Sequence, residues 1–210
     1  MNRVVTIGRE FGSGGRELGF RLAEQLGFHY YDKEIVTAIV NNTELAEGFV
    51  KDIIDGKTHR YLSLTIGQSM NLSVDYQIHQ MQTIIKAQTE VIKEMAQKSD
   101  CVIVGRGADY ILKDLRDEGG IELFRIFVYA DPESRLKRCI DRAPKGENMT
   151  EKELVKQIKR INKERASYYE DYTLQKWGDK SNYDLCVNTS FMNIEEMVPH
   201  LAKLFEKSSS

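Results

Sequence analysis

A short apolar strand runs straight into a glycine-rich turn and a helix in VVTIGREFGSGGRELG, at residues 4–19. Residues 4–7 form a β-branched run, and residues 16–27 carry leucines along one side of a helix that ends in glycine. Loops of this kind bind anions, because their amides and the positive end of the helix dipole converge on one point. The segment therefore predicts an α/β fold with an anion site.

The glycine loop departs from the usual phosphate-binding pattern, in which glycine, four residues and glycine precede lysine and Ser or Thr. If Gly14 is the last glycine, Gly15 stands where lysine belongs. If Gly15 is the last, Arg16 takes the lysine position and Glu17 the hydroxyl position, which keeps a cation at the helix start. We favour this second register. We expect this loop to bind the phosphate groups of a nucleotide, through Gly8, Phe11, Gly12, Ser13, Gly14, Gly15, Arg16 and Glu17.

Two other interpretations of the loop remain open. Gly12 and Gly14 begin a dinucleotide-binding match, but its last glycine would fall on Glu17. Asp32 nevertheless follows about twenty residues later, where such folds carry a ribose-binding acid. A purely structural turn is the other alternative.

Further apolar runs alternate with helical patterns along the chain. Strands are expected within residues 28–32, 101–107, 123–133 and 183–190, and a last helix within 193–207. Nearly continuous apolar strands separated by helices imply a parallel sheet covered on both faces. We expect one α/β domain over residues 1–210.

Two segments interrupt this alternation. Residues 33–100 show only helical patterns and predict a helical insertion, with a long helix over 74–98. Its apolar stripe would pack against the core or a second copy, so a homodimer stays open. Residues 139–165 contain a polar, turn-rich stretch between basic helices and predict a lid. The apolar stripe of the helix over 74–98 consists of Ile78, Met81, Ile85, Ile92 and Met95.

Charge and cysteine content narrow the function classes. The chain has 30 basic and 32 acidic side chains, so no overall field draws it to nucleic acid or to an anionic membrane. Its three cysteines form no CxxC pair, and no apolar leader precedes MNRVVTIG. We therefore expect a cytoplasmic protein whose partners are small molecules.

Six ordered motifs resemble the cytidylate kinase-like family, relatives of the bacterial cytidylate kinases among the P-loop nucleoside monophosphate kinases. The resemblance covers residue 4 to about residue 204. It implies a three-layer α/β/α P-loop nucleoside-kinase fold with a parallel sheet, a monophosphate-binding helical insertion and a lid. The implied reaction is phosphoryl transfer from ATP to CMP or dCMP. The motifs are TIGREFGSGGRELG, LGFHYYDKEIV, VIVGRGADYIL, NKERASYYEDYT, KWGD and NYDLCVNTS.

The resemblance assigns residues to the acceptor site. Arg106 follows a core strand, where crevices open in such sheets, and cytidylate kinases have a similar arginine that contacts the monophosphate. The acid of that segment comes later here, at Asp109. Asp32 follows a tyrosine pair, as in cytidylate kinases; it would bind the nucleoside, hold Arg106, or cap the next helix.

The lid region contributes several arginines. Arg135, Arg138 and Arg142 are spaced to share one helix face, and Arg165 approaches from the next helix. Converging guanidinium groups would stabilise transition-state charge. We select Arg142 and Arg165, with Arg16, as catalytic residues. The alternative is a solvated basic face paired with Asp141, Glu151 and Glu153.

Magnesium is expected as a cofactor beside ATP, because it bridges phosphate oxygens during transfer. Ser13 and Glu17 are the candidate protein ligands, and KWGD receives no role. A second hypothesis follows from the absent lysine and hydroxyl: a regulatory protein that binds nucleotides on this fold but transfers no phosphoryl group.

Overall fold

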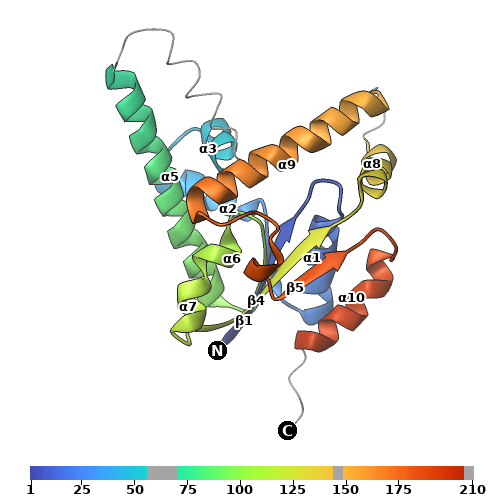
Figure 1. Ribbon diagram of the computed structural model, residues 1–210. Coiled ribbons are helices and arrows are strands. Elements are labelled where there is room, and N and C mark those ends of the chain that lie inside the picture. The colour runs from blue at the N-terminus through green and yellow to red at the C-terminus, as the bar shows by residue number, and fades with distance from the viewer. Residues whose placement is uncertain (56–70, 144–148, 206–210) are drawn as a thin grey trace.

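The computed structural model describes residues 1–55, 71–143 and 149–205. Within them, five strands form one parallel sheet in the order β2-β3-β1-β4-β5 (Figure 1). The strands are β1 (Asn2–Arg9), β2 (His29–Tyr31), β3 (Cys101–Val104), β4 (Ile121–Tyr129) and β5 (Leu185–Asn188). The helices are α1 (Gly15–Leu26), α2 (Glu34–Thr43), α3 (Glu47–Ile54), α5 (Asn71–Lys98), α6 (Ala108–Ile111), α7 (Lys113–Asp117), α8 (Pro132–Asp141), α9 (Glu151–Thr173) and α10 (Ile194–Ala202), with short 3₁₀ turns η1 (Lys180–Asn182) and η2 (Lys203–Phe205).

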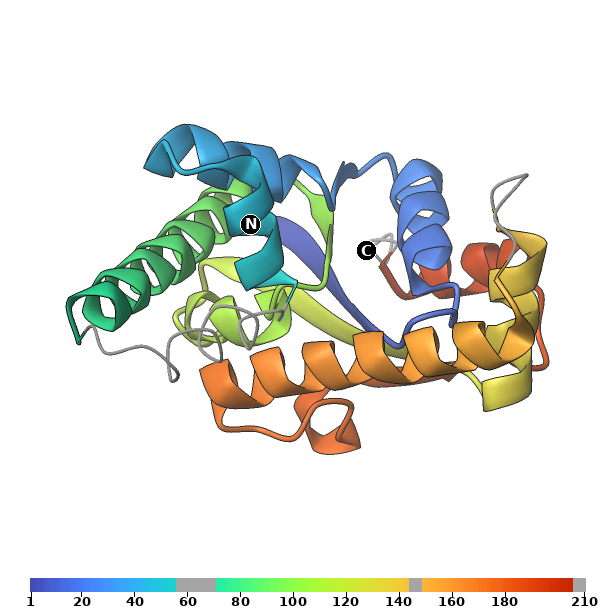
Figure 2. The same ribbon diagram turned by 90° about the horizontal axis from the view of Figure 1, so that it is seen from above.

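Both faces of the sheet are buried, which explains the nearly continuous apolar strands. Val4 and Ile103 pack with residues of α2, α3 and α5 on one face. Val5 and Ile7, which point the other way, pack with α1 and α10. Figures 1 and 2 show α1 and α10 together on one side of the sheet and α5 on the other. The predicted three-layer α/β/α arrangement is therefore confirmed.

The strand order decides between two interpretations of the glycine loop. β3 lies between β1 and β2, whereas in the dinucleotide-binding fold strand 2 lies directly beside strand 1. The dinucleotide interpretation is therefore wrong for this chain. Its third glycine was already missing at Glu17.

Within the described residues, the segment expected as an insertion contains helices α2, α3 and α5, short non-helical stretches beside them, and no strand. Within the apolar stripe of α5, Ile92 is fully buried and Met81 and Met95 pack at the core margin, whereas Ile78 is 40% exposed. The stripe thus packs mainly on this chain's own core. Residues 56–70 of the insertion and 144–148 of the expected lid lie outside the described residues.

Helix α9 crosses the carboxyl ends of the strands (Figures 1 and 2). It begins at a capping box, in which Thr150 and Glu153 exchange side-chain and backbone hydrogen bonds. Asp131 caps α8 through the Ser134 amide, and Pro132 occupies its first turn. These two starts fix where the helices on either side of the polar segment point. The three cysteines are free thiols.

Leu22→Ala should lower the free energy of unfolding by about 2–5 kcal/mol, because Leu22 is fully buried between α1 and the sheet. Urea unfolding followed by circular dichroism measures this. Leu174→Ala is the matched control, since Leu174 is 93% exposed and should change stability little. Equal effects of the two substitutions would contradict the packing described.

Candidate functional site

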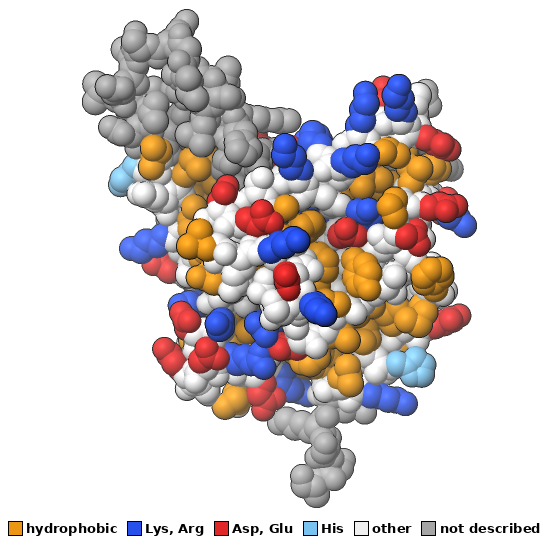
Figure 3. Space-filling model, in the orientation of Figure 1, with side chains coloured by type: hydrophobic (Ala, Val, Ile, Leu, Met, Phe, Trp, Pro, Cys, Tyr) orange, Lys and Arg blue, Asp and Glu red, His pale blue; other side chains and the backbone are white. Residues whose placement is uncertain are grey.

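A cleft of about 650 Å³ opens at the carboxyl ends of the strands, where α/β sheets bind ligands. The glycine loop, α2, α3, the turn after β3, α9 and the segment after α9 line it. On the face in Figure 3, Lys and Arg side chains gather near the upper edge, where α9 runs in Figure 1. The cleft lining itself includes Arg9, Arg16, Arg106 and Arg165, so the site is concave and rich in positive charge.

The glycine loop is held in shape by its own polar groups. Ser13 is fully buried; its hydroxyl donates to the Glu10 carbonyl (2.9 Å) and accepts from the Gly15 amide (3.3 Å). Gly12 and Gly14 both have φ of 80°, in the left-handed region. Within the part of the chain that the structure describes, the Gly12 and Gly14 amides have no hydrogen-bond acceptor. Free amides in a concave loop can bind an anion.

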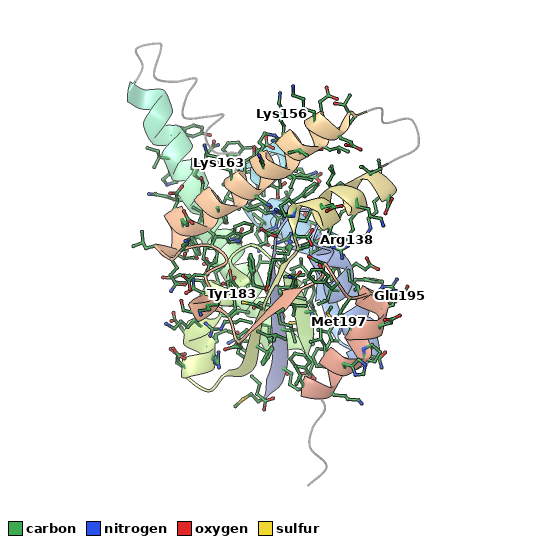
Figure 4. The ribbon with its side chains drawn as sticks, turned by 45° about the vertical axis from the view of Figure 1, so that its right-hand side comes forward. Arg138, Lys156, Lys163, Tyr183, Glu195 and Met197 are labelled. Carbon is green, nitrogen blue, oxygen red and sulfur yellow. The ribbon has the colours of Figure 1, made fainter. Side chains whose placement is uncertain are left out.

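The α8 arginines do share one face, and that face contacts the glycine loop. Arg135 pairs with Glu10 (3.3 Å), and Arg142 forms an ion pair with Glu17. Arg138 donates to the Ser13 carbonyl (3.3 Å) and to Thr189 Oγ1 (3.1 Å), reaching from α8 toward the strand ends (Figure 4). None of the three lines the cleft as the structure describes it. They support the loop from outside, and a catalytic contact of Arg142 stays a prediction.

Arg16 and Asp32, predicted for donor and acceptor, meet at the cleft. Arg16 Nε lies 2.7 Å from Asp32 Oδ2, with Arg16 largely exposed and Asp32 buried. Helix α2 begins after Lys33 and has no side-chain cap, so Asp32 does not cap it. The arginines that Asp32 faces are Arg16 and Arg9 rather than Arg106.

Arg9, which the sequence analysis did not select, lies at the centre of the site. Its side chain is 13% exposed, and its nearest carboxylate is Asp32, at 3.9 Å. The guanidinium fills the space above Gly105, where a Cβ would lie only 1.5 Å from Arg9 Nη1. Burial, and then the charges of Arg165 and Arg106, lower the pKa of Arg9 well below its usual value. The sequence offered one signal for Arg9, namely a charged residue at the end of a buried strand.

Arg106 is aimed by three successive left-handed residues. Gly105, Arg106 and Gly107 have φ of 76°, 62° and 65°, an arrangement that favours glycine on either side. Arg106 Nη1 donates to Asp55 Oδ1 (2.5 Å) and to the Ile54 carbonyl (3.0 Å). The turn thus returns the side chain from β3 toward the end of α3.

Arg165 ties α9 to the glycine loop. Its Nη1 donates to the Arg9 carbonyl (3.0 Å), and its guanidinium lies 5.7 Å from the Phe11 ring centre. Asn162, one turn earlier on α9, accepts from the Phe11 amide (2.7 Å). Burial, followed by the charge of Arg106, lowers the pKa of Arg165 to about 10. Arg16, Arg106 and Arg165 therefore reach one cleft, together with Arg9.

Asp109 is a buried acid in the cleft wall. Its carboxylate accepts from the Tyr169 hydroxyl (2.7 Å), and burial raises its pKa to about 6. Nearby, Tyr168 donates to Gln88 (3.1 Å), which donates in turn to the Arg106 carbonyl (2.9 Å). This chain of hydrogen bonds connects α9, α5 and the Arg106 turn.

The predicted magnesium ligands are engaged with protein groups. The Ser13 hydroxyl serves the loop itself. Burial alone would raise the pKa of Glu17, but hydrogen bonds from Arg142 and Arg21 outweigh it and lower that pKa. Among the described residues, no group of three or more His, Cys, Asp or Glu side chains is arranged to hold a metal. Neither residue fits a metal in this arrangement, and their assignment stays a prediction.

The family is shown by the match between residues 4–191 and the model of the cytidylate kinase-like family. The chain belongs to this family. No curated protein matches it. A crystal structure of an uncharacterized protein from Eubacterium ventriosum is 25% identical, with a TM-score of 0.68 over 99% of this chain and 100% of the other. Shikimate kinase from Bacteroides thetaiotaomicron is 15% identical, with a TM-score of 0.54 over 97% and 98%.

The family match confirms the resemblance seen in the sequence motifs. The shikimate kinase shows the fold alone, which is that of the P-loop kinases. The family and the fold together indicate that the chain is a kinase-like phosphotransferase with a nucleotide-binding fold. No helix in the described residues has the length and apolar character needed to cross a bilayer.

Arg9→Met should leave the melting temperature without ligand at least as high as in the unchanged protein. The substitution removes a buried cation whose carboxylate partner, Asp32, is 3.9 Å away and outweighed by burial and by neighbouring arginines. The rise in melting temperature produced by pyrophosphate should shrink, because an anion-binding charge is lost. Differential scanning fluorimetry, with and without pyrophosphate, measures both effects.

Arg3→Met is the matched control at the other end of β1. Arg3 donates two hydrogen bonds to Asp100 Oδ2 (2.9 and 2.6 Å), so its loss should lower the melting temperature and leave the pyrophosphate effect intact. If Arg9→Met behaved like this control, Arg9 would be a structural residue and our interpretation of its charge would be wrong.

Asp109→Asn should stabilise the protein at pH 7 but not at pH 4. The pKa of Asp109 is about 6 when folded and near 3.8 when unfolded, so its stabilising contribution is complete at low pH and is lost as pH rises through 6. Asparagine avoids this loss and can still accept from Tyr169. Urea unfolding at both pH values should show a gain on the order of 3 kcal/mol at pH 7.

The exposed Asp114→Asn serves as the control, because no buried carboxyl group is removed there. A variant at Asp109 that was less stable than the unchanged protein at pH 7 would contradict the assignment.

Proposed function

We propose that the protein transfers the γ-phosphoryl group of ATP to a nucleoside monophosphate, with CMP or dCMP as acceptor. One observation carries this proposal: Arg9, Arg106 and Arg165 converge beside the glycine loop, and Asp32 and Asp55 are the carboxylates paired with their cluster. A strongly cationic cleft next to an anion-binding loop suits two phosphorylated substrates placed end to end.

In the proposed reaction, an oxygen of the acceptor phosphate forms a bond to the γ-phosphorus, while the bond from that phosphorus to the β–γ bridging oxygen breaks. The products are ADP and a nucleoside diphosphate. The attacking oxygen is already largely deprotonated near neutral pH, so no general base is required. The protein's task is to hold both substrates in line and to neutralise charge.

The arginines divide this task according to their positions. Free amides of the glycine loop, with Arg16, would hold the donor phosphates. Arg106, on the turn after β3, would bind the acceptor phosphate. Arg165, which donates to the Arg9 carbonyl at the end of β1, would act with Arg9 to neutralise the transferred group. Arg16 must leave Asp32 to reach a phosphate.

Magnesium belongs to this proposal as a companion of ATP, where it would neutralise charge on the phosphate oxygens. We assign no step to a bond between the ion and a side chain, since Ser13 and Glu17 are engaged elsewhere.

A regulatory protein that binds nucleotides without transfer remains the second candidate. It is favoured by the ion pairs that occupy Arg16 and Glu17, the two residues at the lysine and hydroxyl positions. It predicts nucleotide binding at the same cleft.

Turnover assays separate these two functions. Purified protein is incubated with ATP, magnesium and one of CMP, dCMP, UMP, AMP or GMP, and ADP formation is measured. The kinase proposal expects steady turnover with CMP or dCMP. Binding of nucleotides with no turnover for any acceptor would contradict it and support the regulatory protein.

Arg106→Gln should lower kcat/KM for the acceptor about 10- to 100-fold, because a charge-assisted contact to phosphate is lost. Lys159→Gln is the matched control, since Lys159 is exposed on α9 away from the cleft lining. Arg16→Ala should mainly raise KM for ATP. Unchanged ATP kinetics in that variant would show that the chosen register of the loop is wrong.

A further inference from the structure

The two walls of the cleft differ in chemistry. On the α2 and α3 side, the described lining residues are aliphatic, hydroxyl-bearing or charged, and none is aromatic. The opposite wall, from α9 and the segment after it, presents aromatic rings. The rings on this wall belong to Tyr168, Tyr169, Trp177 and Tyr183.

Trp177 is presented by a rigid turn that uses the rest of the KWGD motif. Its ring meets Phe127 edge to face at 5.4 Å, and its amide donates to Glu170 Oε1 (3.3 Å). Gly178 has φ of 75°, and a Cβ there would lie 2.9 Å from the Phe127 ring. Asp179 accepts from the Ser181 amide (2.9 Å) and fixes the following turn. The motif thus builds one wall of the cleft.

Tyr183 supplies an independent sign that this wall faces a ligand. The residue is only 7% exposed, and within the described residues its hydroxyl makes no hydrogen bond of good geometry, although the Tyr169 hydroxyl and the Gly178 backbone lie near it. The hydroxyl lies at the cleft wall, 3.3 Å from where a Cβ on Gly8 would be. Figure 4 shows Tyr183 beneath α9. A buried hydroxyl whose hydrogen bonds are poorly formed is uncommon, and a polar atom of a bound ring would give it a better partner.

Resting on the proposed function, we propose that Trp177 and Tyr183 form a subsite for the planar base of the acceptor nucleotide. The Trp177 ring contacts the base by stacking or edge to face, and the Tyr183 hydroxyl forms a hydrogen bond with a polar atom of the base. This wall is near the arginines, because Tyr169, which neighbours Tyr183, lies four residues, about 6 Å of helical rise, from Arg165. A ribose is sufficient to connect a ring here with a phosphate on the arginines.

Binding of CMP and of ribose 5-phosphate tests the subsite, because the two share sugar and phosphate and differ in the ring. Calorimetry without ATP gives both affinities. AMP, GMP and UMP are measured in the same way. The unchanged protein should bind at least one nucleotide about tenfold more tightly than ribose 5-phosphate, as expected for one stacked base. If all four nucleotides bind no more tightly than ribose 5-phosphate, the proposal is overturned.

Substitutions locate the preference for the ring. Trp177→Leu should remove the difference between nucleotide and ribose 5-phosphate while ribose 5-phosphate still binds, which also shows that the variant is folded. Trp177→Phe should restore most of the difference, and Tyr183→Phe should reduce it by losing one hydrogen bond. Arg106→Gln is the contrasting variant and should weaken both ligands equally.

The outcomes for subsite and function can be told apart. If nucleotides bind more tightly than ribose 5-phosphate, this difference depends on Trp177, and no phosphoryl transfer occurs, the subsite is supported and the kinase proposal is contradicted. Turnover with CMP in a Trp177→Leu variant that still prefers CMP over ribose 5-phosphate would support the kinase and overturn the subsite. The sole tryptophan of the chain adds a direct readout, since its fluorescence should change when CMP binds but not when inorganic phosphate binds.

Discussion

Repulsion between like charges is the constraint around which this site is built. Arg9, Arg106 and Arg165 reach one cleft from β1, the turn after β3 and α9. Burial, and then the charges of neighbouring arginines, lower the pKa of Arg9 and of Arg165. Such a cluster is held together only because the surrounding fold is stable. The two-faced core, the hydrogen bonds of α9 to the glycine loop and the α8 arginines behind that loop supply this stability.

Much of the fold could be predicted from the sequence because both faces of the sheet are buried. The runs around Ile7, Ile103 and Ile126 are apolar without interruption, and that pattern identifies a parallel sheet between helices. The strand order could not be obtained in this way. It depends on which strands lie side by side, and that is decided by packing between distant segments rather than by local pattern.

Site residues that belong to a sequence motif could be predicted. Residues whose role depends on a partner far away in the sequence could not. Arg16, Arg106 and Arg165 do reach one cleft, and Asp32 lies behind it, paired with Arg16. Arg9 was missed because, in the sequence, it looks like the polar end of a strand. Its place in the site depends on Gly105, whose missing side chain leaves the space that the Arg9 guanidinium fills. Nor could the sequence show that Glu17 is paired with Arg142, since 125 positions separate them.

The left-handed turn at residues 105–107 has a consequence for comparing relatives. Its two glycines are required by the backbone, since a side chain on Gly105 would collide with Arg9. A relative that keeps this glycine pair therefore reports a conserved shape and says little about its chemistry. The residue between the glycines is the informative one: a relative with a neutral side chain there would keep the architecture and lose a charge from the cleft. That single position therefore decides whether the turn carries a positive charge into the cleft.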